Sequence, residues 1–314
     1  MGQQPGRSKT QRDQSFHCRL GRMRLLLLLL AFTTLAGVPQ LPAAREGNHV
    51  SYGIPLRVVG NSLKEADSLI RMQLVMGPRT WLRQVAQGWV GRPYGSGGKG
   101  VAAHELLINL QQMDCMTAVE NLMAMYVAGE WYRQGLLPPE EAFIQALLRV
   151  RYESYPPCRW EDRYHYLAHA FISWEANGWG YWLSLGKPDN RSIRYISQYR
   201  ERYKGFTDWK RIRAIERELS KRPRFWIPEA EVGGWLGLLQ DGDLIAFIPS
   251  DSLLDVSHVG VFFWEGGKAT FAHASLSARK WVWGEDLCAY LDRREKVIGI
   301  TVFRPFERLS CGIW

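Results

Sequence analysis

The sequence predicts an α+β protein, with helices in the first two-thirds of the chain and an antiparallel β-sheet in the last third. Before Pro228, apolar residues recur at helical spacing between turn signals. After Pro228, short β-branched or aromatic segments are bounded by Gly, Pro and Asp, a pattern typical of strands. The 314 residues allow one large domain or two small ones. We expect helices packed on a C-terminal antiparallel sheet or small barrel.

The predicted helices are separated by turn and proline signals. Ser62 and the residues before it form a capping signal for the first helix. Two proline pairs, at 138–139 and 156–157, divide the later ones. Residues 178–224 are polar and aromatic and give no clear pattern before the last helix. The predicted helices cover residues 63–76, 79–90, 115–131, 140–151, 160–174 and 208–221.

The predicted strands follow one another closely after Pro228. Glu265-Gly-Gly267 is a hairpin turn signal between the second and the third of them. The strands are expected at residues 243–247, 256–264, 269–274, 280–283 and 297–303.

The first 44 residues predict a signal peptide. A charged stretch at 22–24 precedes an apolar run at 25–30, and a small-residue cleavage site follows. The run is too short to favour a permanent membrane span. Met23 is an alternative start, and an uncleaved anchor is the alternative to cleavage. We expect residues 45–314 to form a single mature domain in the periplasm or outside the cell.

Composition restricts the kind of partner. The net charge is +9, and residues 1–44 contribute +5 of it through six basic side chains and one acid. The remainder suits an anionic substrate or surface. No Lys/Arg run accompanies a recognised nucleic-acid module, so we expect no nucleic-acid partner. We also expect the protein to be a monomer. The 14 Trp are compatible with a Trp-rich core or with stacking on sugar rings, and both alternatives stay open.

Cys115 is the candidate nucleophile. It follows a glycine-rich loop at 91–98 and begins an apolar helix. The positive end of the helix dipole favours a thiolate, which predicts a lowered pKa for this thiol. His258 and His273 lie on two predicted strands that flank one hairpin, where they could meet as base and orienting group. A cysteine, a base and an orienting group are the parts of a cysteine hydrolase.

The other cysteines and histidines indicate neither a disulfide scaffold nor a metal site. Cys18 falls in the predicted signal peptide. At most one disulfide is expected among the three other cysteines, Cys158, Cys288 and Cys311. His165 and His169 have the i,i+4 spacing of metal ligands, but no Glu base lies between them and no third ligand is apparent. We therefore expect no metal and no cofactor.

Four motifs occur in a characteristic order: Gly91-Arg-Pro-Tyr94, Asp114-Cys115, Ser257-His-Val-Gly260 and His273-Ala274. In this order they resemble the NlpC-type cell-wall hydrolases, which are papain-like cysteine peptidases. A closer branch, once catalogued as a domain of unknown function, is described as N-acetylmuramoyl-L-alanine amidase-like and is similar over roughly residues 63–307. This chain departs from that branch at two positions, Ala118 and Tyr164, where the branch usually has an aromatic residue and a Leu.

The resemblance implies a papain-like fold, in which the helix of the catalytic cysteine packs on a β core at about 240–307. A helical insertion is implied at about 137–225. The resemblance further implies that Cys115 is the nucleophile, His258 the general base and His273 the orienting residue.

The resemblance also places Tyr94 in the oxyanion site together with the Cys115 backbone N–H, the alternative being a loop Tyr packed on the core. Residues 151–180 are expected to form one wall of the groove. The candidate substrate-binding residues are Arg163, His165, Ser257 and Ser275. For Arg163, a buried pair with Glu120 is an equal alternative, and Asp114 is expected to cap the helix.

The expected function is that of an exported amidohydrolase acting on peptidoglycan or muropeptide fragments. It would cleave the amide between N-acetylmuramic acid and L-alanine through a thioester on Cys115. The alternatives are a stem-peptide endopeptidase of the γ-D-glutamyl type, an acyltransferase that uses the same thioester, and a non-catalytic muropeptide-binding protein. The complete set of Cys115, His258 and His273 argues against the last, because binding alone needs no thiolate.

Overall fold

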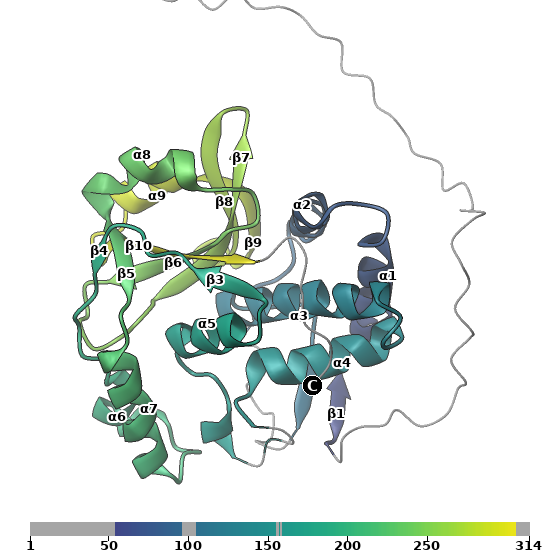
Figure 1. The fold of residues 1–314 in the computed structure, drawn as a ribbon, viewed down its shortest axis with the longest axis horizontal. Helices are drawn as coiled ribbons and strands as arrows, with labels where there is room; N and C mark the ends of the chain where they lie inside the picture. Colours follow the sequence, from purple (N-terminus) through teal and green to yellow (C-terminus); the bar gives the residue numbers. More distant parts are fainter. Residues whose placement is uncertain (1–53, 96–104, 155–156, 158, 306–314) are drawn as a thin grey trace, which may run out of the picture. The chain divides into compact units, whose positions relative to one another are not determined.

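An antiparallel sheet with helices on both faces is the centre of the fold in the computed structural model, which describes residues 54–95, 105–154, 157 and 159–305 (Figure 1). The strands of this sheet are β3 (Gly180–Trp182), β4 (Lys187–Pro188), β5 (Phe225–Pro228), β6 (Leu244–Pro249), β7 (His258–Glu265), β8 (Lys268–Ser275), β9 (Lys280–Asp286) and β10 (Val297–Pro305). Their order is β4-β5-β10-β6-β7-β8-β9, and β3 pairs antiparallel with β10. The α+β class and the antiparallel sheet are confirmed.

Most helices precede the long strands of this sheet, as the sequence predicts, and one lies between β9 and β10. The α-helices are α1 (Ser62–Met72), α2 (Pro78–Gly88), α3 (Cys115–Arg133), α4 (Pro139–Arg151), α5 (Leu167–Ala176), α6 (Tyr195–Gln198), α7 (Trp209–Lys221), α8 (Val232–Trp235) and α9 (Leu287–Asp292). Short 3₁₀ turns lie at Trp160–Asp162, Arg200–Arg202, Glu229–Glu231 and Leu236–Leu238. Two further strands, β1 (Leu56–Val58) and β2 (Leu106–Ile108), form a separate parallel pair.

The helix predicted over residues 160–174 is wrong in its first half. The Tyr164 N–H donates to the Arg151 carbonyl at 3.0 Å, and Arg163 forms a bridge with Tyr152. These contacts hold the chain extended beside the end of α4, so α5 begins only at Leu167. The local apolar pattern could not show this pairing, because the partner strand segment lies more than ten residues earlier in the sequence.

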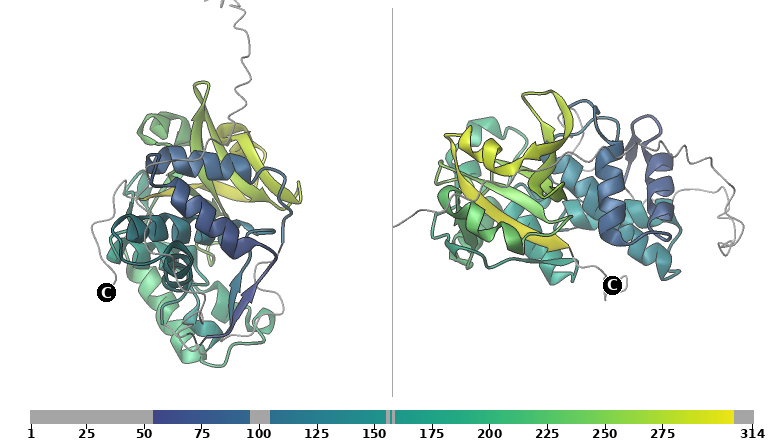
Figure 2. Two further views of the ribbon diagram at one scale, coloured as in Figure 1. Left: turned by 90° about the vertical axis from the view of Figure 1, so that its right-hand side faces the viewer. Right: turned by 90° about the horizontal axis from the view of Figure 1, so that it is seen from above.

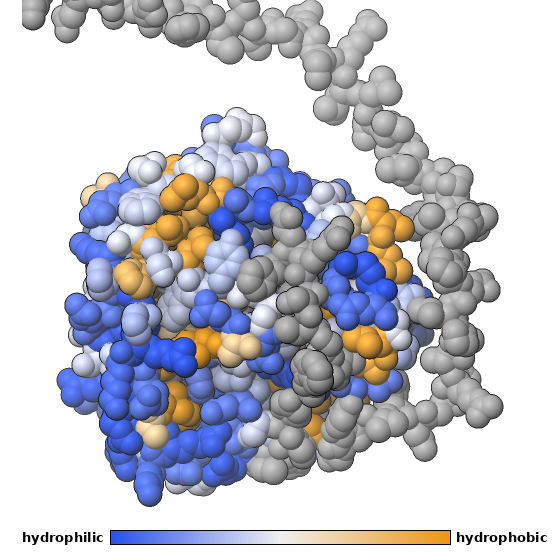
Figure 3. All heavy atoms as spheres, in the orientation of Figure 1, coloured by the Kyte–Doolittle hydropathy of each residue, from blue (hydrophilic) through white to orange (hydrophobic). Residues whose placement is uncertain are grey.

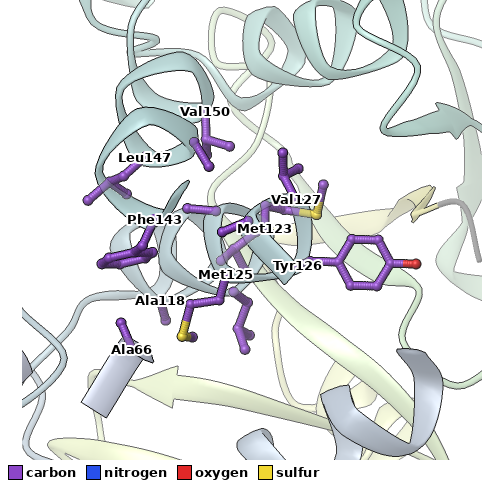
Figure 4. Close-up of a cluster of buried hydrophobic side chains, with 14 of the residues drawn as sticks. Ala66, Ala118, Met123, Met125, Tyr126, Val127, Phe143, Leu147 and Val150 are labelled. Atoms are coloured by element: carbon purple, nitrogen blue, oxygen red, sulfur yellow. The ribbon is translucent and has the colours of Figure 1, made fainter. Parts of the chain in front are cut away.

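Helix α3 is the central core element. Its residues from Thr117 to Tyr132 are all buried, and its sequence is apolar on every side, as expected for a helix surrounded by protein. It packs along α4, where Met125 of α3 and Phe143 and Leu147 of α4 contribute to one apolar cluster (Figure 4). Close packing on all sides fixes the axis of α3 and therefore the position of its first residue, Cys115.

The sheet buries a different apolar layer on each face. Val259, Val261 and Phe263 of β7 belong to the same core as α3. On the opposite face, Phe262 and Phe271 pack with residues of α8 and α9, and Figure 1 shows these two helices on the side of the sheet away from α3. Side chains alternate between faces along a strand, so β7 contacts both layers.

The peripheral helices complete these layers. Helices α1 and α2 lie side by side in both views of Figure 2, and the Trp81 indole N–H donates to the Leu69 carbonyl at 2.7 Å. Helices α6 and α7 form a smaller apolar cluster with α5. Hydrophilic side chains gather over α6 and α7 on the face shown in Figure 3. Within the described ranges, no helix is long and apolar enough to cross a membrane.

The hairpin of β7 and β8 brings the two histidine positions together. The predicted turn at Glu265-Gly-Gly267 is confirmed, because Glu265 pairs with Lys268 and the two glycines have φ values of 55° and 81°. Positive φ at both central residues is the signature of a type I′ hairpin turn, whose twist matches that of the strands. His258 therefore starts β7 close to where β8 carries His273.

Candidate active site

A capping box fixes the start of α3. The Asp114 carboxylate accepts the Thr117 N–H at 2.8 Å, and the Thr117 hydroxyl accepts the Asp114 N–H at 3.0 Å. The predicted role of Asp114 as the helix cap is therefore confirmed, and Cys115 is the first helical residue.

The environment of Cys115 reverses the predicted direction of its pKa. Burial raises the pKa of the Cys115 thiol to about 12, and the charge of Asp114 adds to this effect. Backbone hydrogen bonds from Val259, Met116 and Cys115 itself lower the pKa, but they are outweighed. The expectation of a thiolate in the resting protein is wrong, because desolvation of this half-buried sulfur exceeds the effect of the hydrogen bonds that favour the thiolate. The thiol is neutral until a base removes its proton.

Tyr94 lies beside this thiol. Its N–H donates to the Arg279 carbonyl at 2.9 Å, and it bridges Met113 just before the cap. Burial raises the pKa of Tyr94 to about 12, with further contributions from the charges of Cys115 and Asp114. The phenol therefore keeps its proton at neutral pH and is available as a hydrogen-bond donor.

His258 and His273 form the start of a hydrogen-bonded chain. His258 Nε2 lies 2.6 Å from His273 Nδ1, and His273 Nε2 lies 2.6 Å from Glu285 Oε2. The Arg293 guanidinium donates to the other oxygen of Glu285 at 2.7 Å. Val259, whose N–H reaches Cys115, follows His258 directly in β7. The structure therefore places the predicted nucleophile against the strand that carries the predicted base, and it pairs that base with the predicted orienting residue.

The chain of hydrogen bonds sets the tautomers of both rings. A carboxylate only accepts hydrogen bonds, so the proton between His273 and Glu285 belongs to His273 Nε2. His273 Nδ1 then has a free lone pair and accepts the proton of His258 Nε2. His258 Nδ1 is left without a proton, which is the form that a general base requires.

Both histidines are neutral over a wide pH range. Burial lowers the pKa of His258 to about 3, with smaller contributions from His273 and Arg294. Burial and the charge of Arg294 lower the pKa of His273 to about 4. Neither ring carries a charge in the resting state at neutral pH, so the resting site contains a thiol and two neutral imidazoles.

The close packing of β7 on β8 explains why Gly260, two positions after His258, has no side chain. A Cβ atom at Gly260 would lie 2.7 Å from Phe271 Cδ2, 2.8 Å from the Ala272 carbonyl oxygen and 3.1 Å from His273 Cβ. A side chain here would push β8 and His273 away from His258. The His-x-Gly motif is thus a packing requirement of the histidine pair.

The sequence analysis did not identify Glu285 and Tyr290, which contact the histidine rings. Glu285 lies on β9, two residues beyond the end of the predicted strand at 280–283. A longer strand prediction would have placed it beside β8, although an irregular register between β8 and β9 obscures the pairing. The Tyr290 ring on α9 packs 6.2 Å from the ring of His258 and 5.6 Å from that of His273.

An open cavity of about 700 Å³, here called the histidine cavity, adjoins the two rings. It is lined by residues that include Ser257, His258, His273, Ser275, Tyr290 and Arg294. The exposed Ser257 donates to the Phe247 carbonyl at 3.2 Å, and the buried Ser275 hydroxyl accepts the Ala278 N–H at 3.2 Å. Both predicted serines therefore face the same space as the histidines.

Arg163 and His165 have other contacts. Arg163 donates to both oxygens of the fully buried Glu120, at 2.8 and 3.0 Å, and Arg151 donates to the same carboxylate at 2.8 Å. His165 Nε2 lies 2.6 Å from the Trp160 carbonyl oxygen. Neither side chain lines the histidine cavity, so the lining gives no support to residues 151–180 as its wall. The substrate-binding roles of both residues stay predictions.

Replacing Arg163 distinguishes its role in a buried ion pair with Glu120 from a role in substrate binding. We expect Arg163→Met to lower the free energy of unfolding by about 2 kcal/mol, because buried Glu120 loses a charged partner. KM should change less than about twofold, because the lost hydrogen bonds are internal. Denaturant unfolding and steady-state kinetics measure the two quantities, with exposed Arg213→Met as the matched control. A severalfold rise in KM without loss of stability would assign Arg163 to substrate binding.

No group of three or more His, Cys, Asp or Glu side chains in the described part of the chain is placed to hold a metal ion. The ring of His169 lies edge-on to Tyr164, with 4.8 Å between centroids. Cys115 and Cys288 are free thiols. Cys158 and Cys311 fall outside the described residues, as does the predicted signal peptide.

The fold and the site together define an α+β protein with a cysteine at a helix start and a His–His–Glu chain on the adjoining sheet. A family profile described as N-acetylmuramoyl-L-alanine amidase-like matches residues 84–300. The chain belongs to this amidase-like family of peptidoglycan hydrolases. A search of the curated proteins gives no match.

Solved structures agree with this assignment. One structure of an N-acetylmuramoyl-L-alanine amidase from Bacteroides uniformis has 25% identity and a TM-score of 0.64, covering 79% of this chain and 100% of that one. Another has 26% identity and a TM-score of 0.65, covering 71% and 98%. A Legionella pneumophila protein with 17% identity shares the fold, with a TM-score of 0.57 and coverage of 81% and 98%.

Proposed function

We propose that this protein is a cysteine amidohydrolase that cleaves the amide between N-acetylmuramic acid and L-alanine. The observation that carries the proposal is the meeting of Cys115, at the start of α3, with the strand on which His258 pairs with His273. Family membership and the amidase name of the Bacteroides uniformis structures support the choice of bond. We also propose the NlpC-type, papain-like fold, because the cysteine helix packs on the antiparallel sheet that carries both histidines.

Acylation begins from the neutral thiol. His258 Nδ1 takes the proton of the thiol as the Cys115 sulfur attacks the lactyl carbonyl carbon of the muramic acid. The carbon–sulfur bond forms and the carbonyl π electrons move to oxygen. When the tetrahedral intermediate collapses, the carbon–nitrogen bond breaks and His258 returns its proton to the departing nitrogen of L-alanine. A muramoyl thioester on Cys115 remains.

Deacylation uses the same base. Water attacks the thioester carbon while His258 Nδ1 takes a proton from it, and the carbon–sulfur bond breaks. The proton passes to the sulfur, so the free muramic acid carboxyl and the Cys115 thiol are regenerated. The Tyr94 hydroxyl and the Cys115 backbone N–H would stabilise the oxyanion in both steps. The raised pKa of Tyr94, about 12, keeps this donor protonated.

Glu285 acts through the histidines rather than on the substrate. By accepting the His273 Nε2 proton, its carboxylate keeps His258 Nδ1 free to act as base. It also stabilises the positive charge that spreads over the histidine pair during catalysis. Arg293 holds the carboxylate in place through its other oxygen.

We expect Glu285→Gln to lower kcat roughly tenfold, less than the 10²–10⁴ that a general base contributes. The amide can donate to His273 Nε2 as well as accept from it, so the opposite tautomer of both rings becomes populated. Two-bond ¹H–¹⁵N spectra of the imidazoles report that tautomer, which a purely structural role would leave unchanged. Glu265→Gln, an exposed carboxylate on β7, is the control and should leave kcat and the spectra as in the wild type. Wild-type tautomers in Glu285→Gln would refute the positioning role.

Product analysis tests the proposed bond. A muramoyl tripeptide of defined sequence should yield free N-acetylmuramic acid and an intact peptide that begins with L-alanine, as identified by mass spectrometry. Products that keep L-alanine on the sugar would indicate the stem-peptide endopeptidase instead. Binding without any turnover would indicate a muropeptide-binding protein. The signal-peptide pattern supports the further proposal that the reaction takes place in the periplasm or outside the cell.

A further inference from the structure

Arg294 is an exposed cation beside the two histidines. In the described part of the chain, no carboxylate forms an ion pair with it. Its guanidinium carbon lies 4.7 Å from the centroid of the Tyr290 ring and its side chain hydrogen-bonds Tyr290. Tyr290 in turn packs against both histidines. Arg294 therefore stands one side chain away from the histidine pair and lines the same cavity.

The neighbouring residue Arg293 differs from Arg294 in having a carboxylate partner. Arg293 is engaged by Glu285 at 2.7 Å, whereas among the described residues Arg294 contacts the ring and hydroxyl of Tyr290 and no carboxylate. An arginine stacked on an aromatic ring is held in one orientation and still presents its remaining N–H groups to solvent. Such a side chain is prepared to bind a carboxylate through two parallel hydrogen bonds.

The charge of Arg294 also opposes proton uptake by the histidine pair. Its charge lowers the pKa of both His258 and His273, and a base of low pKa is a weak proton acceptor. Glu285, which contacts His273, is itself paired with Arg293 at 2.7 Å. Cys115 and Tyr94 are neutral at moderate pH, because both have a raised pKa of about 12. Lys296, Asp251 and Glu295 also line the cavity.

We propose that Arg294 binds a free carboxylate of the substrate, on the residue that follows L-alanine. This inference rests on the proposed function. In a muramoyl stem peptide that residue is D-glutamate linked through its γ-carboxyl, so its α-carboxylate is free and lies one residue from the scissile amide. Docking of this carboxylate cancels the charge of Arg294 and strengthens His258 as a base. Substrate recognition and activation of the base are thereby coupled.

Two muramoyl tripeptides that differ only in the α-group of D-glutamate, carboxylate or carboxamide, test this proposal. For the wild type we expect kcat/KM to be roughly 10- to 100-fold higher for the carboxylate, the range given by a charged hydrogen-bonded pair. Arg294→Met should reduce this ratio to near one, while exposed Arg213→Met on α7 should keep it. For the carboxylate substrate alone, the acidic limb of kcat should lie at higher pH than that of kcat/KM.

Each alternative outcome has a distinct meaning. A preference for the carboxylate that survives in Arg294→Met would overturn the assignment of the subsite to Arg294. Equal cleavage of both tripeptides by the wild type would overturn the carboxylate subsite and leave the amidase proposal intact. Cleavage of neither tripeptide at the muramoyl amide would overturn the proposed function and this inference with it.

Discussion

Cys115→Ala is expected to reduce kcat by roughly 10⁴-fold or more, because the proposed covalent intermediate forms on the sulfur that this change removes. The fold should be retained, since the cap of α3 is made by Asp114 and Thr117 and does not involve the sulfur. Steady-state hydrolysis of a muramoyl tripeptide measures the loss of turnover. Circular dichroism and thermal unfolding check that the variant is folded.

Cys288 provides the matched control. It is a free thiol on α9, half-buried like Cys115, and belongs to a different cavity from the histidines. Cys288→Ala should therefore keep the wild-type kcat and KM. Substantial hydrolysis by folded Cys115→Ala would show that the reaction does not pass through this sulfur.

His258→Ala is expected to cost roughly 10²- to 10⁴-fold in kcat, the contribution of a general base. The loss should be at the upper end, because the pKa of the Cys115 thiol is raised to about 12 and the thiol cannot ionise without a base. His273→Ala should cost less, since the His258 ring keeps its contacts with Phe247 and Tyr290 and part of its orientation. Kinetics on both variants give the comparison.

His169→Asn is the control for these histidine variants, because its ring packs against Tyr164 and does not line the histidine cavity. Its kcat should stay within about twofold of the wild-type value. If His273→Ala lost more activity than His258→Ala, the roles assigned to the two rings would be reversed.

The pH dependence of activity follows from the same groups. With the pKa of His258 lowered to about 3, the base is unprotonated at all higher pH. The acidic limb of a kcat/KM–pH profile is therefore expected well below the pH at which an ordinary histidine titrates. The Tyr94 hydroxyl, with its pKa raised to about 12, sets no limit at moderately alkaline pH.

Local signals made much of the site predictable from the sequence. The cap at Asp114 marks the start of α3, and the glycines of the β7–β8 turn mark the hairpin that carries both histidines. Both signals act within a few residues, so they can be recognised without the tertiary structure. The order of motifs then related Cys115 to His258 and His273 across more than a hundred residues.

Long-range packing decided what could not be predicted. The pKa of Cys115 depends on burial by strands far away in the sequence, so the helix position alone gave the wrong direction. The short strands β3 and β4 arise in the polar region predicted as a helical insertion, and they form only because β10 and β5 offer paired edges. Glu285 was missed for the same reason, since its partner is set by the irregular register of β9 on β8.

The central claim is that a muramoyl thioester forms on Cys115, and rapid acid quenching during turnover tests it most directly. After proteolysis, mass spectrometry should find the peptide of Cys115 heavier by N-acetylmuramic acid less one water. The adduct should be absent from Cys115→Ala and unaffected by metal chelators. Products formed with no adduct on Cys115, together with activity lost on chelation and restored by zinc, would contradict the account.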